Sequence, residues 1–210
     1  MMQPPERLPE RDAAITAMLP HVSFDGWTRR ALRHGLADIG APLDDAELLF
    51  PGGAVDMVSC FCDLADRQME AGAAAMDWTD LRLPTRVRAI IALRLEQNRP
   101  HKEAIRRALA VLALRGGAGT AAGCTARTVD AIWHAAGDTS ADFSWYTKRA
   151  ILASVYTTTL LFWLRDASDD DGETLAFLDR RLAAVGGIGK LRRRAEAALN
   201  RFIPARFRSA

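Results

Sequence analysis

The sequence predicts an all-α protein, and three observations carry this prediction. No stretch alternates apolar and polar residues for long enough to form a convincing strand. Apolar residues instead recur at the three- and four-residue spacing of helices, between clear breakers. Alanine, the best helix former, is plentiful, while aromatic residues make up only 7% of the chain. The length of 210 residues indicates one domain, or one domain with an appendage. With 49% hydrophobic residues, the chain can form a hydrophobic core.

The N-terminal part predicts two helices of about a dozen residues, a short third helix and a long fourth one. The first should close before or around Pro20, Gly40 fits the stop of the second, and Pro51-Gly52-Gly53 ends the third. The apolar residues that mark the first two helices fall in residues 15–22 and 27–39, and the third and fourth helices are expected over 43–50 and 54–72.

Six further helices follow, and a turn or loop signal separates each from the next. They are expected over residues 85–97, 101–115, 120–136, 144–165, 173–184 and 188–202. The separating signals are Pro84, Pro100, the loop Gly116–Gly119, Gly137, the turn Asp169–Gly172 and Gly186-Gly187. The chain shows no internal repeat, so about nine or ten helices should build a single bundle.

The order of the first four helices resembles that of TetR-type regulators. In those proteins the second and third helices form a helix-turn-helix, and the remainder builds a ligand-binding and dimerising body. The turn Phe24–Trp27 and the segment Leu48–Gly52 resemble the corresponding turn and closing segment. The predicted fold is therefore a TetR-like bundle with three parts: a helix-turn-helix-like region at 1–53, a lipid-binding and dimerising body at 54–185, and a basic amphipathic helix at 186–210.

The predicted helix-turn-helix carries the wrong charge for DNA. Its third helix holds Asp44, Asp45 and Glu47 and no cation, whereas DNA affinity comes largely from neutralising phosphates. The net charge of +2 also does not indicate a general nucleic-acid binder. Arginines on the preceding helix could still touch a DNA backbone; they are Arg29, Arg30 and Arg33. We expect no nucleic-acid partner, and a TetR-type repressor that senses an apolar ligand stays open as the alternative.

No arrangement of residues predicts an enzyme, a metal site or a cofactor. The four histidines lie far apart, and the chain contains no Glu-x-x-His pair, no His-Glu-x-x-His and no Cys-x-x-Cys. Gly186–Lys190 lacks the first glycine and the hydroxyl residue of a phosphate-binding loop. The three cysteines (Cys60, Cys62 and Cys124) indicate a reducing compartment. We expect no catalytic residue, and a bound lipid as the only small-molecule partner.

The last predicted helix is basic and amphipathic. Its apolar side and its cationic side separate at about 100° per residue. The residues expected to contact a membrane are Ile188, Leu191, Arg193, Arg194, Leu199, Arg201 and Phe202. Such a helix gains from apolar insertion and about 1 kcal/mol per cation near an anionic bilayer. The alternative is an ordinary helix that packs on the body with a solvated face.

A dense run of aromatic and charged residues, Asp138–Ala150, opens the long apolar helix after residue 144. Two interpretations stay open from the residues alone: a helix cap with packed aromatics, or a docking patch, since Trp, Tyr and Arg dominate interface energies. The run resembles the signature of the ninth Coq protein family, the lipid-binding accessory family of ubiquinone (coenzyme Q) biosynthesis. Matches at Phe24–Trp27, Leu49–Gly53 and Phe177–Arg181 extend the resemblance over roughly residues 11–185.

The resemblance implies a non-enzymatic protein that binds isoprenoid quinone intermediates at a membrane and presents them to demethoxyubiquinone hydroxylase. It implies that the signature docks this hydroxylase, through residues Asp142, Trp145, Tyr146, Lys148 and Arg149. It also supports the C-terminal membrane helix, and the helices of a TetR-like body imply a homodimer. A purely structural scaffold for a biosynthetic complex is a third interpretation.

The lipid is expected between the long fourth helix and the apolar helix after the signature. Both carry more large apolar residues than one helical layer needs. The expected lipid-binding residues are Met57, Phe61, Leu64, Leu152, Tyr156 and Leu160. The N-terminus resembles neither a secretory signal nor a transit peptide. We therefore expect a bacterial cytoplasmic protein, peripheral on the inner membrane.

Overall fold

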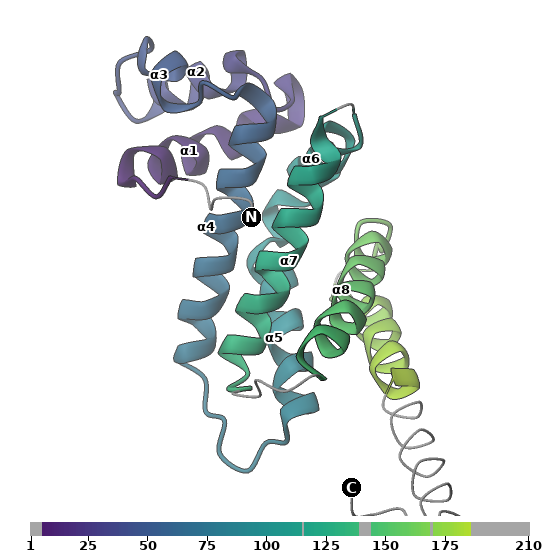
Figure 1. Ribbon diagram of the computed structural model, residues 1–210. Coiled ribbons are helices and arrows are strands. Elements are labelled where there is room, and N and C mark those ends of the chain that lie inside the picture. Colours follow the sequence, from purple (N-terminus) through teal and green to yellow (C-terminus); the bar gives the residue numbers. More distant parts are fainter. Residues whose placement is uncertain (1–5, 115, 139–143, 169, 186–210) are drawn as a thin grey trace, which may run out of the picture.

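The computed structural model describes residues 6–114, 116–138, 144–168 and 170–185, and within them it is a helical bundle without strands. Figure 1 shows a small N-terminal unit on top of a longer body of nearly upright helices. The elements are α1 (Pro9–Asp25), α2 (Arg29–Asp38), α3 (Asp45–Leu49), α4 (Gly53–Ala74), α5 (Leu83–Gln97), the 3₁₀ helix η1 (Arg99–His101), α6 (Lys102–Ala113), α7 (Gly117–Ala135) and α8 (Ser144–Trp163). Residues 172–185 form a further helix. The predicted all-α class is confirmed.

The N-terminal unit consists of α1, α2 and α3. Thr28 caps α2, because its hydroxyl accepts a hydrogen bond from the Ala31 N–H. Gly35 lets α2 approach the α1 backbone closely, since a Cβ atom there would lie 2.6 Å from the Met18 nitrogen. The prediction that the first helix ends around Pro20 is wrong. Helix α1 continues to Asp25, and the exposed Pro20 ring lies within it.

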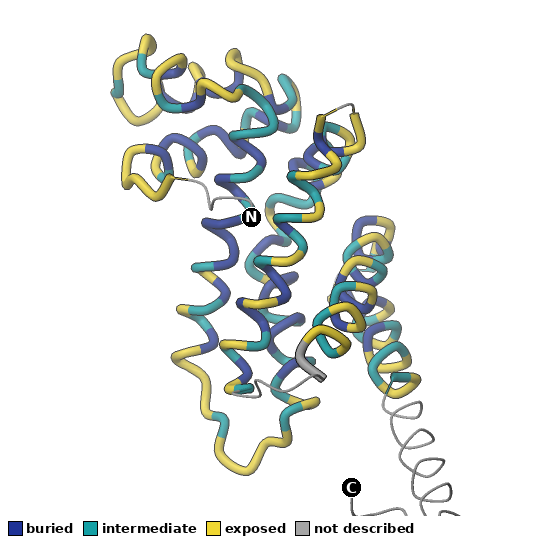
Figure 2. The backbone as a smooth tube through the Cα atoms, in the orientation of Figure 1, coloured by how far each residue is buried: buried dark blue, intermediate teal, exposed yellow. Residues whose placement is uncertain are grey.

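Helix α4 connects this unit to the body and packs on α1, α5 and α7. Figure 2 shows buried residues on the facing sides of these helices and exposed residues on the outside. Trp27 joins the two parts: its indole N–H donates to the Ala104 carbonyl of α6 at 2.9 Å, and its ring lies 5.5 Å from that of Phe61. The N-terminal unit and the body therefore share one continuous core.

Helix α8 and residues 172–185 form an antiparallel pair on the side of the body. The rings of Phe162 and Phe177 stack with centroids 4.6 Å apart. Asp166, in the turn before the second helix of the pair, caps that helix, because its carboxylate accepts hydrogen bonds from the backbone and hydroxyl groups of Ser168 and Thr174. Arg88 of α5 pairs with Asp179 at 2.9 Å and ties the pair to the body.

Helix α7 begins earlier than the sequence predicts. The glycine-rich segment was expected as a loop up to Gly119, but α7 starts at Gly117. Gly116 takes the left-handed conformation, with φ 91°, immediately before the helix and so makes the turn. None of the described helices is long and apolar enough to cross a membrane.

Candidate functional site

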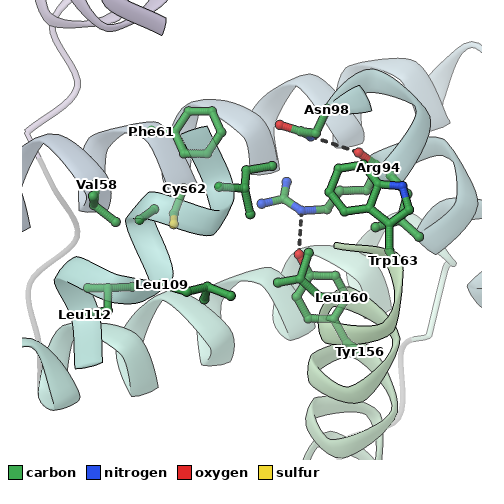
Figure 3. A pocket seen from close by; sticks show the side chains of 13 residues that line it. Val58, Phe61, Cys62, Arg94, Asn98, Leu109, Leu112, Tyr156, Leu160 and Trp163 are labelled. Atoms are coloured by element: carbon green, nitrogen blue, oxygen red, sulfur yellow. Dashed lines mark hydrogen bonds between the residues drawn. The ribbon is translucent and has the colours of Figure 1, made fainter. Parts of the chain in front are cut away.

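An apolar cavity of about 70 Å³ lies between α4, α5, α6 and α8. Phe61 of α4, Leu109 of α6, and Tyr156, Leu160 and Trp163 of α8 contribute most of its apolar wall. Figure 3 shows these side chains converging on one space from three sides. A cavity of this size is smaller than the ~150 Å³ that holds benzene, so it must widen to accept a ring.

A second apolar cavity, of about 210 Å³, lies along the contact between α5 and α8. Val155 lines the second cavity, and its neighbour Tyr156 lines the first. Leu83 and Val87 of α5 close one side, and Val185, at the end of the last described helix, closes another. From residue 148 to residue 163 the two cavities follow about 22 Å of α8, at 1.5 Å per residue. The two cavities along α8 are called the apolar tract below.

One end of this tract carries buried polar groups. The Arg94 side chain, 6% exposed, donates from Nε to the Tyr156 hydroxyl at 3.0 Å, and its Nη1 lies 2.9 Å from the Asp66 carboxylate. Asp66 also accepts a hydrogen bond from the Thr128 hydroxyl at 2.8 Å. Burial works against the cation, but Tyr156 and Asp66 hold the pKa of Arg94 above its usual value. Arg94 is therefore a permanent charge in an apolar wall.

Two thiols lie behind the first cavity. Cys62 of α4 lines it and is hydrogen-bonded to Cys124 of α7. This contact, followed by burial, raises the pKa of Cys62 well above the ordinary value. The same contact lowers the pKa of Cys124 to about 7, helped by the nearby charge of Arg127. The three cysteines are free.

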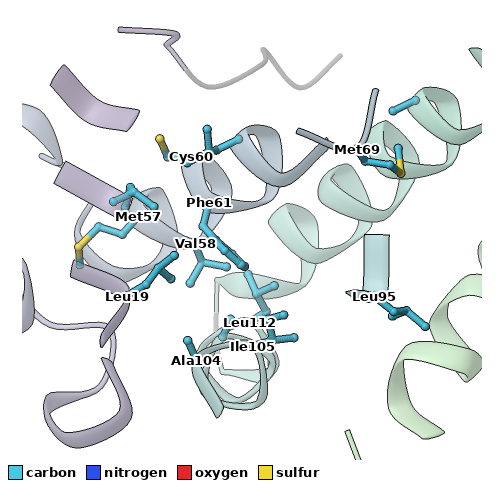
Figure 4. Packing of buried hydrophobic residues seen from close by; sticks show 14 of the residues in the cluster. Leu19, Met57, Val58, Cys60, Phe61, Met69, Leu95, Ala104, Ile105 and Leu112 are labelled. Atoms are coloured by element: carbon cyan, nitrogen blue, oxygen red, sulfur yellow. The ribbon is translucent and has the colours of Figure 1, made fainter. Parts of the chain in front are cut away.

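The structure divides the six expected lipid-binding residues into three groups. Phe61, Tyr156 and Leu160 line the first cavity, and Leu152 lines the second. Met57 and Leu64 face the core instead, with 1% and 9% of their surface exposed, and line neither cavity. Figure 4 shows Met57 near Leu19 of α1, on the side of α4 that holds the N-terminal unit.

The signature residues that the structure describes lie at the start of α8. Tyr146 is 75% exposed, Lys148 lies 3.7 Å from Asp138, and Arg149 pairs with Asp130 of α7. Lys148 also lines the second cavity, so the signature stands at the outer end of the apolar tract. Asp142 and the Trp145 side chain lie outside the described residues, as do all the expected membrane residues.

The arginines of the helix-turn-helix-like unit pair with its own carboxylates. Glu47 of α3 lies 2.7 Å from Arg29 and 3.9 Å from Arg33 of α2, and Asp25 lies 3.2 Å from Arg30. The cations that could have touched a DNA backbone are thus partly neutralised. Phosphate contacts would have to compete with these pairs.

Sequence reasoning missed Arg94 and Asn98, the polar residues of the first cavity. A signal for Arg94 was present, because it lies two helical turns after Val87, on the apolar face that Ile90 and Ile91 also share. A cation on such a face requires a buried partner. The partner itself, Asp66, comes from another helix and could not be read from spacing.

The fold and its cavities define a class: a TetR-like helical protein with a degenerate helix-turn-helix and an apolar tract in its body. The fold matches the crystal structure of the TetR transcriptional regulator from Nitrosomonas europaea ATCC 19718, with a TM-score of 0.67 over 84% of this chain and 98% of that one. The sequence identity is 22%, so this likeness concerns the fold alone.

The family model of COQ9 matches residues 118–189 of this chain. The chain is 31% identical to the mitochondrial ubiquinone biosynthesis protein COQ9 of Rattus norvegicus, over 83% of this chain and 58% of that protein. It is 33% identical to COQ9 of Drosophila melanogaster, over 82% of this chain and 54% of that protein. The chain therefore spans little more than half the length of these relatives. The resemblance expected from the signature is confirmed.

Proposed function

We propose that this chain is a non-enzymatic, lipid-binding accessory protein of ubiquinone biosynthesis that binds isoprenoid quinone intermediates. The observation that carries the proposal is the apolar tract between α5 and α8, part of which is formed by residues that match the COQ9 family model. The similarity to mitochondrial ubiquinone biosynthesis proteins gives the pathway. The tract supports an apolar ligand, because its walls suit a long hydrocarbon chain.

A polyprenyl chain gains strongly from such a tract. Each buried CH₂ group contributes about 0.8 kcal/mol, so a few isoprene units outweigh the cost of widening the cavities. The free volumes of about 70 and 210 Å³ describe the protein without ligand. Both α5 and α8 line each cavity, so a displacement of α8 away from α5 would enlarge both.

Presentation to demethoxyubiquinone hydroxylase is the second part of the proposal. The signature at the start of α8 lies beside the outer end of the tract, where Lys148 lines the second cavity. A partner bound at Tyr146 and Arg149 would therefore contact the helix that encloses the lipid. The basic segment 186–210 follows the cavity-lining residue Val185 and would hold this end at the bilayer. We include a homodimer and a location on the bacterial inner membrane in the proposal.

Mass spectrometry of lipid extracted from the purified protein tests the lipid-binding part. We expect isoprenoid quinones or their precursors to copurify with the wild-type chain. Leu160→Arg would place a charge in the first cavity and should abolish copurification, whereas Leu114→Arg, at a residue 69% exposed, should not. A folded wild-type protein that carries no lipid would favour the scaffold interpretation.

A TetR-type repressor is the competing function. The matching fold favours it, and the ion pairs of Glu47 and Asp25 with the arginines of α2 argue against it. A gel shift with the DNA upstream of the coding gene separates the two functions.

A further inference from the structure

The first cavity is apolar except where Arg94, Asn98 and Tyr156 meet. We propose that Arg94 and Tyr156 bind an uncharged oxygen acceptor on the ring of the ligand, such as a quinone carbonyl or a phenol oxygen. The ligand's chain then lies along the second cavity, toward the start of α8. This inference rests on the proposed function and adds to it the class of head group and the direction in which the ligand lies.

Arg94 has a hydrogen-bond donor to spare. Its Nη1 atom is buried and donates no hydrogen bond within the described part of the chain, although it lies 2.9 Å from Asp66. Asp66 balances the charge, but a buried N–H that is not hydrogen-bonded is still unfavourable. Figure 3 shows the guanidinium reaching between the side chains of α4 and α8 that form the cavity wall. An oxygen atom of a ligand in this cavity would accept this hydrogen bond.

Tyr156 supplies a second donor next to the first. Its hydroxyl accepts the hydrogen bond from Arg94 Nε at 3.0 Å, and among the described residues no acceptor for its own proton is found. Contact with the cation makes this proton a better donor. One oxygen atom could therefore receive hydrogen bonds from both side chains.

The charge balance selects a neutral head group. Asp66, itself buried, already compensates the charge of Arg94, and no other charged residue lines the first cavity. A phosphate or carboxylate would bring an uncompensated negative charge into an apolar space, which is strongly unfavourable. A carbonyl, methoxy or hydroxyl oxygen adds no net charge. This excludes an ordinary phospholipid head from this end of the tract.

The chain direction follows from where the polar groups lie. Arg94 and Asn98 occur near the C-terminal end of α5, beside Tyr156 and Trp163 of α8. The second cavity lies toward the N-terminal ends of both helices and is lined by apolar side chains apart from Lys148 at its outer end. A ligand that places its oxygenated ring at Arg94 therefore places its isoprenoid chain in the second cavity.

The test compares two probes that share a decyl chain. Decylubiquinone carries ring oxygens, and decylbenzene carries a ring without them. We expect calorimetric titration of the wild-type protein to give tighter binding of decylubiquinone than of decylbenzene. Tyr156→Phe should weaken decylubiquinone binding about fivefold, because it removes one neutral hydrogen bond, and leave decylbenzene binding unchanged.

Arg94→Ala alone would leave the Asp66 carboxylate buried without its partner and could prevent folding. Both charged side chains are therefore replaced together by neutral ones. The double variant Asp66→Asn with Arg94→Gln should weaken decylubiquinone binding about tenfold or more and spare decylbenzene. Thr159→Val is the control. Thr159 is fully buried on the same helix, and its hydroxyl donates only to the Val155 carbonyl at 2.8 Å, outside the first cavity.

The outcomes separate this inference from the proposed function. Equal affinity of the wild-type protein for both probes, or variants that weaken both probes alike, would overturn the role of Arg94 and Tyr156 while leaving the apolar tract as a lipid site. Failure of both probes to bind the folded wild-type protein would overturn the lipid site and this inference together. Selective loss of decylubiquinone binding in both variants, with the Thr159→Val control unchanged, is the result that supports it.

Discussion

Replacing Gly35 by alanine should destabilise the N-terminal unit. The new Cβ atom would lie 2.6 Å from the nitrogen and 2.8 Å from the Cα atom of Met18, and 2.8 Å from the carbonyl carbon of Ala17. These are backbone atoms of α1, which cannot rotate away as a side chain can. Helices α1 and α2 must therefore separate, which loosens the packing around Met18, Leu32 and Leu36.

The magnitude follows from two opposing effects. Overpacking a tight contact costs about 1–3 kcal/mol, and a clash with backbone belongs at the upper end of that range. Alanine recovers up to about 1 kcal/mol through its higher helix propensity. The net loss should be about 1–2 kcal/mol. For a chain of this size it corresponds to a fall in Tm of roughly 2–8 °C, measured by circular dichroism.

Gly119→Ala is the matched control. Gly119 also lies in a helix, α7, but nothing approaches its Cβ position within 4 Å. The same gain in helix propensity applies without the clash, so the Tm should stay the same or rise slightly. If Gly35→Ala melts at or above the temperature of Gly119→Ala, the close approach of α2 to α1 does not stabilise the fold as argued.

Four further predictions can be checked separately. Asp166→Ala should lower the free energy of unfolding, measured in urea, by about 1 kcal/mol, because it removes the cap of helix 172–185. Burial opposes ionisation of Asp166, but the hydrogen bonds from Ser168 and Thr174 hold its pKa far below the usual value. The stabilisation by Asp166 is therefore complete above about pH 5 and declines as the pH falls below about 4. Gel shifts should show no salt-sensitive nanomolar binding to upstream DNA, and such binding would establish the repressor instead. Deletion from Gly187 onward should weaken flotation with anionic liposomes while the body stays folded, and unchanged flotation would remove this helix as the membrane contact. Trp145→Ala and Arg149→Glu should reduce hydroxylase pull-down without unfolding the protein, whereas a lower Tm with retained binding would assign the signature to capping and core packing.

The fold could be predicted because local signals and packing agree along most of the chain. Gly40 and Pro84 stand at helix boundaries in the structure, as the sequence indicated. Pro20 misled the prediction because a proline usually ends a helix. Here the ring and the carbonyl of Thr16, which loses its hydrogen-bond partner, lie on the exposed side of α1 and can be solvated. Burial of the opposite face then keeps the helix continuous.

The cavity was only partly predictable because periodicity does not show which partner a helical face meets. Met57 and Phe61 are one turn apart on α4 and equally apolar. Met57 packs in the core, while Phe61 reaches the first cavity beside Ile105 of α6. That difference depends on where α6 crosses α4, which only the tertiary structure shows. The start of α8 was easier to single out from the sequence, since it carries the signature Asp138–Ala150.

Arg94 shows how a violation of the helical pattern can locate a functional site. An arginine on an apolar face costs several kcal/mol unless it is paired, and even a well-paired buried ion pair is often no more stabilising than an apolar replacement. Stability alone therefore gives little reason for Arg94 and Asp66 at the centre of this bundle. A spare donor at the closed end of an apolar tract gives a reason, because it discriminates an oxygenated ring from a plain hydrocarbon. If that reasoning is right, the Asp66→Asn, Arg94→Gln variant should lose selectivity for the quinone and retain most of its Tm.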